Sequence, residues 1–272
     1  FIYYDPDLID SGCSRIRLMQ SMSPSNIALI MRKKVTDSAW KHVFVTREIV
    51  DFNFYNYISM VFPLYVSGGE GELLLDESGR RANLSRQALK WVTSLVKPTE
   101  VSRIDLNSNE LPEIALSYFY AVLHSHDYRT RYAEFLKIDF PRLPLTSRLD
   151  LFCALAKLGG ELVALHLMES PRLDKHITRW IGGRNPKAEK VTYSDKTVWI
   201  DKAQTTGFKG VPEDVWNFHI GGYQVCEKWL KDRKGRTLSQ EDTIHYQKII
   251  VAISETIGIM AEIDKVIEKY GG

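Results

Sequence analysis

Hydrophobic and polar residues follow two different periods along the chain, and the change of period predicts where strands give way to helices. In the first hundred residues the apolar runs are short and are separated by polar or glycine-containing turns, which is typical of β-strands. Strands are expected at Asn26–Met31, Lys41–Thr46, Val61–Val66 and Leu73–Leu75. Ser85–Val96 has helical spacing and stops before Pro98, which predicts a short helix.

The middle of the chain, Leu111–Met168, has α-helical spacing and is broken at a Pro-Arg-Leu-Pro link, at Pro141 and Pro144. After the link, leucines recur at alternating intervals of four and three residues. These leucines are Leu151, Leu155, Leu158, Leu162 and Leu165. The spacing predicts a helix with a narrow apolar seam that packs along another helix.

The C-terminal segment is the expected partner of this leucine-rich helix. Ser239 and Asp242 have the spacing of a capping box, which marks the start of a helix. Apolar residues then recur in a nearly heptad pattern as far as Tyr270, with the polar Thr256 at one step of the seam. A helix of roughly 30 residues with one apolar seam normally gains its stability by packing on a partner.

Between the two helices the pattern returns to short β-like runs, over residues 176–220. Trp216–Ile220 alternates apolar and polar residues, as a half-buried strand does. Gly221 and Gly222 then turn the chain into a helix expected to start at Tyr223.

These patterns together predict an α+β fold with a long C-terminal helix packed on the leucine-rich helix. The sections expected are a mixed N-terminal section with short strands at 1–110, a helical section at 111–170, and a small basic β section with the C-terminal helices at 171–272.

Composition places the chain in the ordinary globular class, since 44% of its 272 residues are hydrophobic and 26% are charged. Its three widely spaced cysteines predict neither a disulfide framework nor a zinc site. No apolar run approaches the ~20 residues that span a bilayer, and the sequence contains no basic-then-apolar signal segment, so we expect a cytoplasmic protein without a membrane partner. The first residue, Phe1, lies in an apolar run, as expected for a piece of a longer polypeptide.

Charge is distributed unevenly, although the net charge is only +2. Residues 171–236 hold 14 Lys and Arg against 8 Asp and Glu, a local net charge of +6. A basic section of this kind favours contact with phosphates, and a solvated basic face without a partner is the alternative.

Three basic clusters are candidate DNA contacts. One follows an expected strand, one brackets an expected turn between two tyrosines, and one ends the helix after the glycine pair. Their members are Arg32, Lys33 and Lys34; Arg129 and Arg131; and Lys228, Lys231, Arg233, Lys234 and Arg236. Arginine is suited to reading guanine edges, whereas lysine more often clamps phosphates. Each cluster is also compatible with a solvated surface, because cations are favoured at helix C-termini.

Motifs for catalysis are missing from the sequence. A phosphate-binding P-loop needs a Gly-Lys pair, and none occurs. The Asn/Asp-Pro-Pro-aromatic motif that holds a flipped adenine is missing, since Asn185-Pro186 is followed by lysine. No Glu-x-Lys unit of a restriction nuclease is present either. We therefore expect a chain that is not an enzyme by itself. His124, His126 and Asp127 are expected to be surface polar groups rather than metal ligands.

The chain resembles the C-terminal specificity region of Type ISP restriction–modification enzymes. The resemblance rests on FIYYDPDLID at the start, KHVFVTREIVDFNFYNYISMVFPLYV (Lys41–Val66), YFYAVLHSHDYRTRYAEFLKIDFPRLPL (Tyr118–Leu145) and WNFHIGGYQVCEKWLKDRKGRTLSQEDTIHYQKII (Trp216–Ile250). His126 is a departure, since it occupies the place of a proline in the family's pattern.

The resemblance implies a target recognition domain that binds double-stranded DNA for an N6-adenine methyltransferase. The methyltransferase and helicase domains of the same bacterial polypeptide would be its partners. S-adenosylmethionine, ATP and Mg would then belong to the full-length protein, with no cofactor in this part. The alternative is an interaction module that couples the helicase motor domain to the methyltransferase domain without reading bases.

Overall fold

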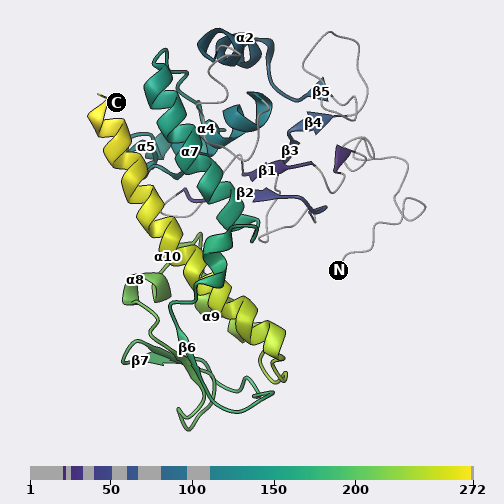
Figure 1. Cartoon of the computed structure of the whole chain (residues 1–272), viewed down its shortest axis with the longest axis vertical. Helices are drawn as coiled ribbons and strands as arrows, with labels where there is room; N and C mark the ends of the chain where they lie inside the picture. The colour runs from purple at the N-terminus through teal and green to yellow at the C-terminus, as the bar shows by residue number, and fades with distance from the viewer. Residues whose placement is uncertain are drawn as a thin grey trace, which may run out of the picture. The chain divides into compact units, whose positions relative to one another are not determined.

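The structure is a computed structural model (Figure 1), and it describes residues 21–22, 26–32, 40–50, 60–66, 81–96 and 111–270. The described residues have an α+β fold, as predicted. The chain forms two compact units. Unit 1 consists of Phe1–Val163 with Glu262–Gly272, and unit 2 consists of Ala164–Ala261. The three sections expected from the sequence reflect residue pattern rather than contacts, and they stay a prediction.

None of the helices in the described part of the chain has both the length and the apolar character that crossing a membrane requires.

The described residues of unit 1 form two small antiparallel sheets. In the first, β1 (Ala28–Met31) lies between β2 (Val43–Thr46) and β3 (Met60–Pro63). In the second, β4 (Tyr65–Val66) pairs with β5 (Arg81–Ala82). The strands predicted near Asn26 and Lys41 are confirmed as β1 and β2.

The single strand expected at Val61–Val66 is instead two strands. Leu64 separates them, and its backbone N–H donates to the carbonyl of Ile27 while its own carbonyl accepts from the N–H of Asn83, both at 2.7 Å. These two bonds switch the chain from one sheet to the other. Leu73–Leu75 lies outside the described residues.

The helices of unit 1 gather around α4, which is buried along most of its length because most of its residues are apolar. The helices are α2 (Arg86–Leu95), α4 (Leu111–His124), α5 (His126–Arg131) and α6 (Ala133–Ile138). Trp91 of α2 lies 5.3 Å from Tyr118 and 5.9 Å from Phe119 between ring centroids. Aromatic pairs at this separation add stability beyond their buried area.

The link after α6 is held by the polar ends of the same aromatic side chains. The indole N–H of Trp91 donates to the carbonyl of Thr146 at 2.7 Å, and the Tyr118 hydroxyl donates to that of Pro144 at 2.8 Å. The Tyr128 hydroxyl donates to the carbonyl of Arg142 at 2.8 Å. The aromatic residues therefore supply both the core of unit 1 and the hydrogen bonds that fix the link.

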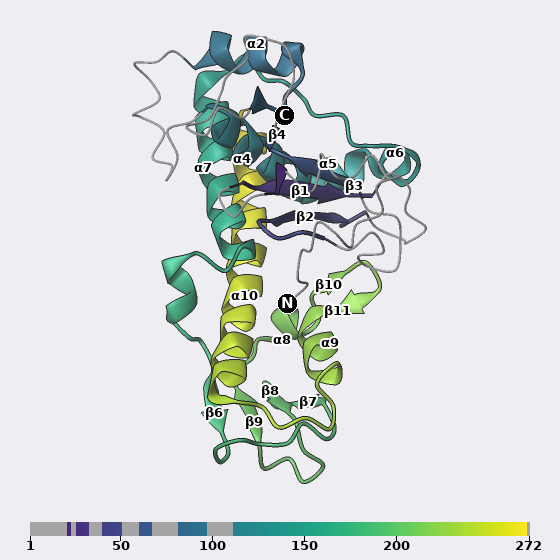
Figure 2. The ribbon, with the colours of Figure 1, turned by 90° about the vertical axis from the view of Figure 1, so that its right-hand side faces the viewer.

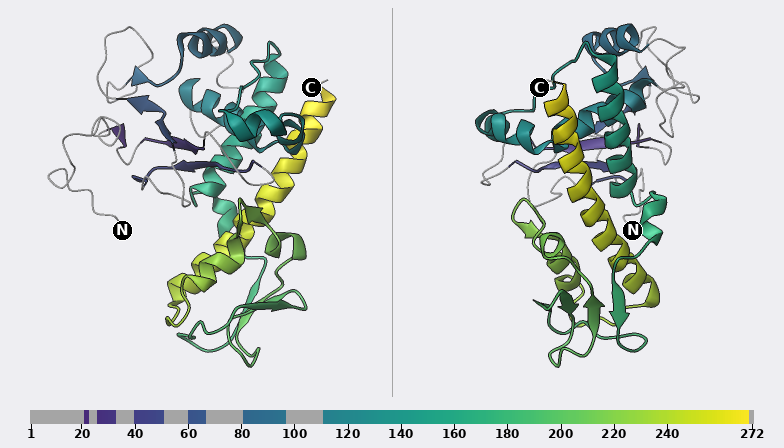
Figure 3. Two further views of the ribbon diagram at one scale, coloured as in Figure 1. Left: turned by 180° about the vertical axis from the view of Figure 1, so that it is seen from behind. Right: turned by 60° about the vertical axis from the view of Figure 1, so that its left-hand side comes forward.

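The leucine-rich helix α7 (Leu149–His166) and the C-terminal helix α10 (Gln240–Lys269) each contribute residues to both units. Leu155, Leu162 and Leu165 are buried, as expected for the apolar seam of α7. In unit 2 a hydrogen bond of 2.9 Å joins His166 Nε2 of α7 to Thr256 Oγ1 of α10. The polar Thr256 in the apolar seam of α10 is thus explained by its hydrogen bond with His166. Figure 3 shows α10 as one unbroken helix in yellow.

Gly159 of α7 marks a close approach to α4 within unit 1. A Cβ atom at this position would lie 1.8 Å from the carbonyl oxygen of Ser117 and 3.1 Å from the backbone nitrogen of Ala121. Only a residue without a side chain fits against this backbone.

Unit 2 is built on a four-stranded antiparallel sheet of order β6-β9-β8-β7 (Figure 2). Its elements are the 3₁₀ turn η3 (Pro171–Asp174), β6 (Arg179–Ile181), β7 (Thr192–Ser194), β8 (Thr197–Trp199), β9 (Gly207–Lys209), α8 (Glu213–Trp216), β10 (His219–Ile220), β11 (Tyr223–Gln224) and α9 (Val225–Lys231). Val198 and Phe208 point from one face of the sheet into a core that includes Leu230 of α9 and Tyr246 of α10.

Two predictions in unit 2 are wrong in detail. Trp216 ends α8 and is not in a strand, because Pro212 precedes the helix and the acidic Glu213 and Asp214 occupy its first turn, where anions are favoured. Tyr223 lies in β11, which pairs with β10 across the glycine pair, so the following helix starts two residues later than expected.

Candidate nucleic-acid interface

The predicted cluster at the end of α9 divides into paired and unpaired cations. Lys228 Nζ lies 2.5 Å from the Asp232 carboxylate, and Lys231 Nζ lies 2.9 Å from that of Glu227. These are exposed ion pairs one helical turn apart, and such pairs contribute little to stability. Their positive charge is nevertheless balanced locally, which weakens their attraction for a phosphate.

Arg233 is also engaged within unit 2. Its guanidinium carbon lies 3.5 Å from the centroid of the Trp229 ring, and its Nε is 3.6 Å from the Asp242 carboxylate. This arrangement holds the guanidinium flat against the protein. Arg233 therefore supports the loop after α9, and its predicted contact with DNA stays a prediction.

Lys234 and Arg236 are exposed, and neither side chain makes an ion pair or hydrogen bond among the residues that the structure describes. Their loop lies beside the segment after β6, since the N–H of Ala188 donates to the Arg236 carbonyl at 3.0 Å. A bridge between Lys187 and Thr237 continues the pairing. A third exposed cation, Lys187, is thereby brought to the same place. We call Lys187, Lys234 and Arg236 the loop cations.

A second group of cations lies at one end of the four-stranded sheet. Arg179 of β6 is directly opposite Lys209 of β9 in the antiparallel register. Trp180 and Phe208, the next pair, face the core. Arg179 and Lys209 therefore face the opposite side of the sheet. Like charges directly opposite destabilise a sheet, and no ion pair within the described residues compensates them. An anion bound beside Arg179 and Lys209 would compensate their two positive charges.

Of the first predicted cluster, the structure describes only Arg32. Arg32 follows β1, the central strand of its sheet, and only 4% of its surface is exposed. Its side chain is therefore not displayed at the surface, and its predicted contact with DNA stays a prediction. Lys33 and Lys34 lie outside the described residues.

Arg129 and Arg131 lie in the helix α5 rather than around a turn, and they have opposite environments. The Nε of Arg129 donates to the carbonyl of Leu123 at 2.6 Å, and its guanidinium lies 5.9 Å from the Trp40 ring. Burial lowers the pKa of Arg129 to about 10, so the side chain remains charged at neutral pH. It supplies a donor to the last turn of α4, whose carbonyls lack helical partners.

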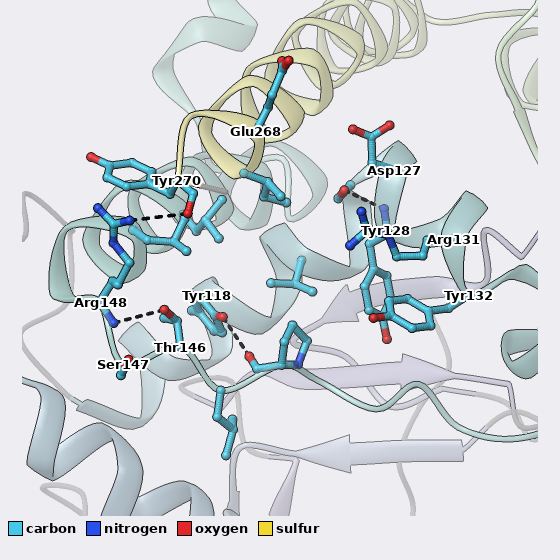
Figure 4. A pocket seen from close by; sticks show the side chains of 17 residues that line it. Tyr118, Asp127, Tyr128, Arg131, Tyr132, Thr146, Ser147, Arg148, Glu268 and Tyr270 are labelled. Atoms are coloured by element: carbon cyan, nitrogen blue, oxygen red, sulfur yellow. Dashed lines mark hydrogen bonds between the residues drawn. The ribbon is translucent and has the colours of Figure 1, made fainter. Parts of the chain in front are cut away.

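Arg131 is exposed and lines a cavity of about 660 Å³ in unit 1, next to Tyr128 and Tyr132 (Figure 4). Arg148 also lines this cavity, and Asp127 and Glu268 contribute negative charge. Two cations are thus matched by two carboxylates, and the cavity does not favour an anion on the basis of charge.

The histidines expected at the surface differ from each other. His126 is exposed, whereas His124 is buried and its Nδ1 lies 2.8 Å from the Tyr120 carbonyl. His126, Asp127 and Asp264 are close enough to hold a metal ion.

Asp264, however, already serves α5. Its carboxylate accepts from the Ser125 hydroxyl at 2.6 Å and from the backbone N–H groups of His126 and Asp127 at 3.3 and 3.4 Å. The carboxylate therefore caps a helix N-terminus, as anions favourably do.

Comparison with known proteins places these observations in a family. A family model described as the Type ISP C-terminal specificity domain matches residues 1–262. A search of curated proteins gives no match.

Three similar solved structures are each 18% identical to this chain. One is a nuclease-deletion mutant of the Type ISP restriction-modification enzyme LlaGI in complex with a DNA substrate mimic, with 88% of this chain covered, 21% of that chain and a TM-score of 0.56. Another is the ATP-dependent Type ISP restriction-modification enzyme LlaBIII bound to DNA. The match covers 89% of this chain and 16% of that chain, with a TM-score of 0.59. The third is a DrdV–DNA complex. The match covers 90% of this chain and 24% of that chain, with a TM-score of 0.57.

This level of identity shows a shared fold, and the chain spans only 16–24% of the length of these proteins. The family model, in contrast, matches nearly all of the chain in one continuous stretch. The chain belongs to the family of Type ISP C-terminal specificity domains.

Proposed function

We propose that this chain recognises a specific sequence in double-stranded DNA on behalf of a restriction enzyme that methylates adenine. The observation that carries the proposal is the match to a specificity domain over residues 1–262. The similar structures support it, because LlaGI is in complex with a DNA substrate mimic and LlaBIII and DrdV are bound to DNA. Mapping methylated adenines in cells that express the full-length protein tests it, since a single repeated motif is the expected result.

Charge in unit 2 gives the proposal a physical basis. The loop cations and the Arg179–Lys209 pair are exposed, and none is in an ion pair among the described residues. Each cation that neutralises a DNA phosphate releases a condensed counterion, which makes binding weaker as salt rises. Such contacts hold and orient the protein on the duplex without reading bases.

Replacing both Arg179 and Lys209 by alanine should weaken binding to all DNA sequences about equally. Two lost phosphate contacts should reduce the slope of log K against log salt by about 2. Fluorescence anisotropy of the full-length protein across a salt series measures this slope. The matched control removes Arg86 and Lys90, two exposed cations of α2, and should leave the slope unchanged. An unaltered slope in the first variant would assign Arg179 and Lys209 to the solvent.

The chain alone should neither transfer methyl groups nor hydrolyse ATP, because the motifs for both reactions are missing from its sequence. Incubation with DNA, ATP and radiolabelled S-adenosylmethionine checks both activities when methyl incorporation into DNA and release of inorganic phosphate are both measured. Incorporation above a blank without protein would contradict the proposal that this part of the enzyme is a recognition module.

A coupling module that joins other domains without reading bases is the second candidate function. One observation favours it. Tyr132, the residue before α6, and Phe135 and Ile138 of α6 are spaced three residues apart, and Phe135 and Ile138 are 70% and 63% exposed. An exposed apolar stripe of this kind is typical of a protein-contacting surface. DNA binding without any sequence preference by the full-length protein would favour this function over the first.

A further inference from the structure

The segment between β6 and the Lys187–Thr237 bridge is a short exposed loop with the sequence Gly-Gly-Arg-Asn-Pro. Arg184 and Asn185 are both exposed, and neither side chain has a hydrogen bond or an ion pair within the described ranges. Arginine and asparagine are also the residues whose planar groups pair bidentately with base edges, arginine with guanine and asparagine with adenine.

The first end of this loop is fixed by glycine. Gly182 has a φ of +137°, and a Cβ atom there would lie 2.6 Å from the side chain of Thr206 and 3.2 Å from that of Trp180. The backbone therefore passes close to two side chains of unit 2. Gly183, the next residue, has open space around its Cβ position, so the chain leaves the protein surface at this point.

The second end is fixed by backbone hydrogen bonds. The N–H of Leu238 donates to the carbonyl of Pro186 at 2.8 Å, and the N–H of Gly235 donates to that of Ala188 at 2.7 Å. Asn185, just before these bonds, has a φ of +55°, the left-handed conformation that asparagine tolerates better than most residues. The loop is thus anchored on both sides, and only its tip extends into solvent.

Exposed cations lie on the segments that anchor this tip. The loop cations Lys187, Lys234 and Arg236 lie on the two segments that the same backbone bonds hold together. Lysines beside an exposed Arg-Asn pair are arranged as a DNA reader requires, with phosphate contacts flanking groups that can enter a groove. We propose that Arg184 and Asn185 read a guanine and a neighbouring adenine in the major groove while the loop cations hold the adjacent phosphates. This inference rests on the proposed function and assigns its specificity to a named loop.

The test is selection of a preferred site from randomised duplex DNA by the full-length protein, followed by competition with single-base variants. Arg184→Ala should reduce discrimination at one G·C pair by about 5- to 150-fold, and Asn185→Ala should do the same at an A·T pair. Other positions of the site should keep their preferences.

Arg184→Lys separates base reading from charge. It retains the positive charge but loses the fork that pairs with guanine, so discrimination should fall as in Arg184→Ala while the salt slope stays the same. Replacing the three loop cations by alanine should have the opposite effect. The slope of log K against log salt should become smaller, and the order of preference among DNA sites should stay the same. Arg86→Ala in α2 controls for the loss of one exposed arginine.

The possible failures are distinguishable. If the unaltered protein selects no site, the proposed function fails and the inference fails with it. If the unaltered protein selects a site and the Arg184 and Asn185 variants keep the same order of preference, only the inference is overturned, whatever their overall affinity.

Discussion

Gly159→Ala is expected to destabilise unit 1 by about 3 kcal/mol or more, at the upper end of the cost of overpacking. The added Cβ atom would lie 1.8 Å from the carbonyl oxygen of Ser117, far inside contact distance. The obstacle is backbone on a buried helix, so it cannot rotate away as a flexible side chain would. α7 and α4 would have to move apart, and the aromatic packing around Tyr118 would loosen. Thermal or urea denaturation of the full-length protein measures the loss.

A matched control is available in α10. Gly258 is also a helical glycine, but apart from its chain neighbours and the adjoining backbone of its own helix, no atom of the described residues lies within 4 Å of its Cβ position. Gly258→Ala should therefore stabilise the protein by up to about 1 kcal/mol, because alanine loses less conformational freedom than glycine on forming a helix. Equal effects of the two substitutions would contradict the close approach of α7 to α4.

Leu162→Ala is expected to cost about 2–5 kcal/mol. The Leu162 side chain is fully buried in unit 1, and its removal leaves a cavity that its neighbours fill only in part. The comparison variant is Leu145→Ala, the same chemical change at a side chain that is 38% exposed in the link before α7. Its cost should be lower than that of Leu162→Ala, because less of the Leu145 side chain is buried. Both are measured by denaturation, and a small loss for Leu162 would mean that the seam is not packed in solution.

Features that depend on nearby residues could be predicted from the sequence. The capping box is confirmed in both directions, since Ser239 Oγ accepts from the N–H of Asp242 and the Asp242 carboxylate accepts from that of Ser239, each at 3.0 Å. The spacing of the leucines predicted α7, and the Pro-Arg-Leu-Pro link predicted the break before it. In each case both partners lie within one or two helical turns of each other.

The environment of individual arginines could not be predicted in this way. Arg129 and Arg131 are two residues apart, yet one is directed into unit 1 and the other lines an open cavity. The difference arises from Leu123 and Trp40, which the fold brings to Arg129. A cluster of basic residues in the sequence shows how many charges are present and leaves open which of them face solvent.

The candidate interface was missed in part for the same reason. Arg179 and Lys209 are opposite each other because β6 pairs with β9, a pairing between strands far apart in the sequence. In the sequence, Asn185 is notable only as part of an incomplete methyltransferase motif, and no pattern singles out Arg184. Their relation to Lys234 and Arg236 depends on the bridge at Lys187, which no local pattern indicates.

The cap that Asp264 provides has a consequence for where this module ends. The family match stops at residue 262, two residues before the carboxylate that accepts three hydrogen bonds at the start of α5. A polypeptide trimmed to the matched residues would lose that acceptor, and the donors at Ser125, His126 and Asp127 would depend on water instead. The matched residues therefore leave out an acceptor on which the start of α5 depends, and any transfer of this specificity module to another enzyme should carry α10 through to its last turn.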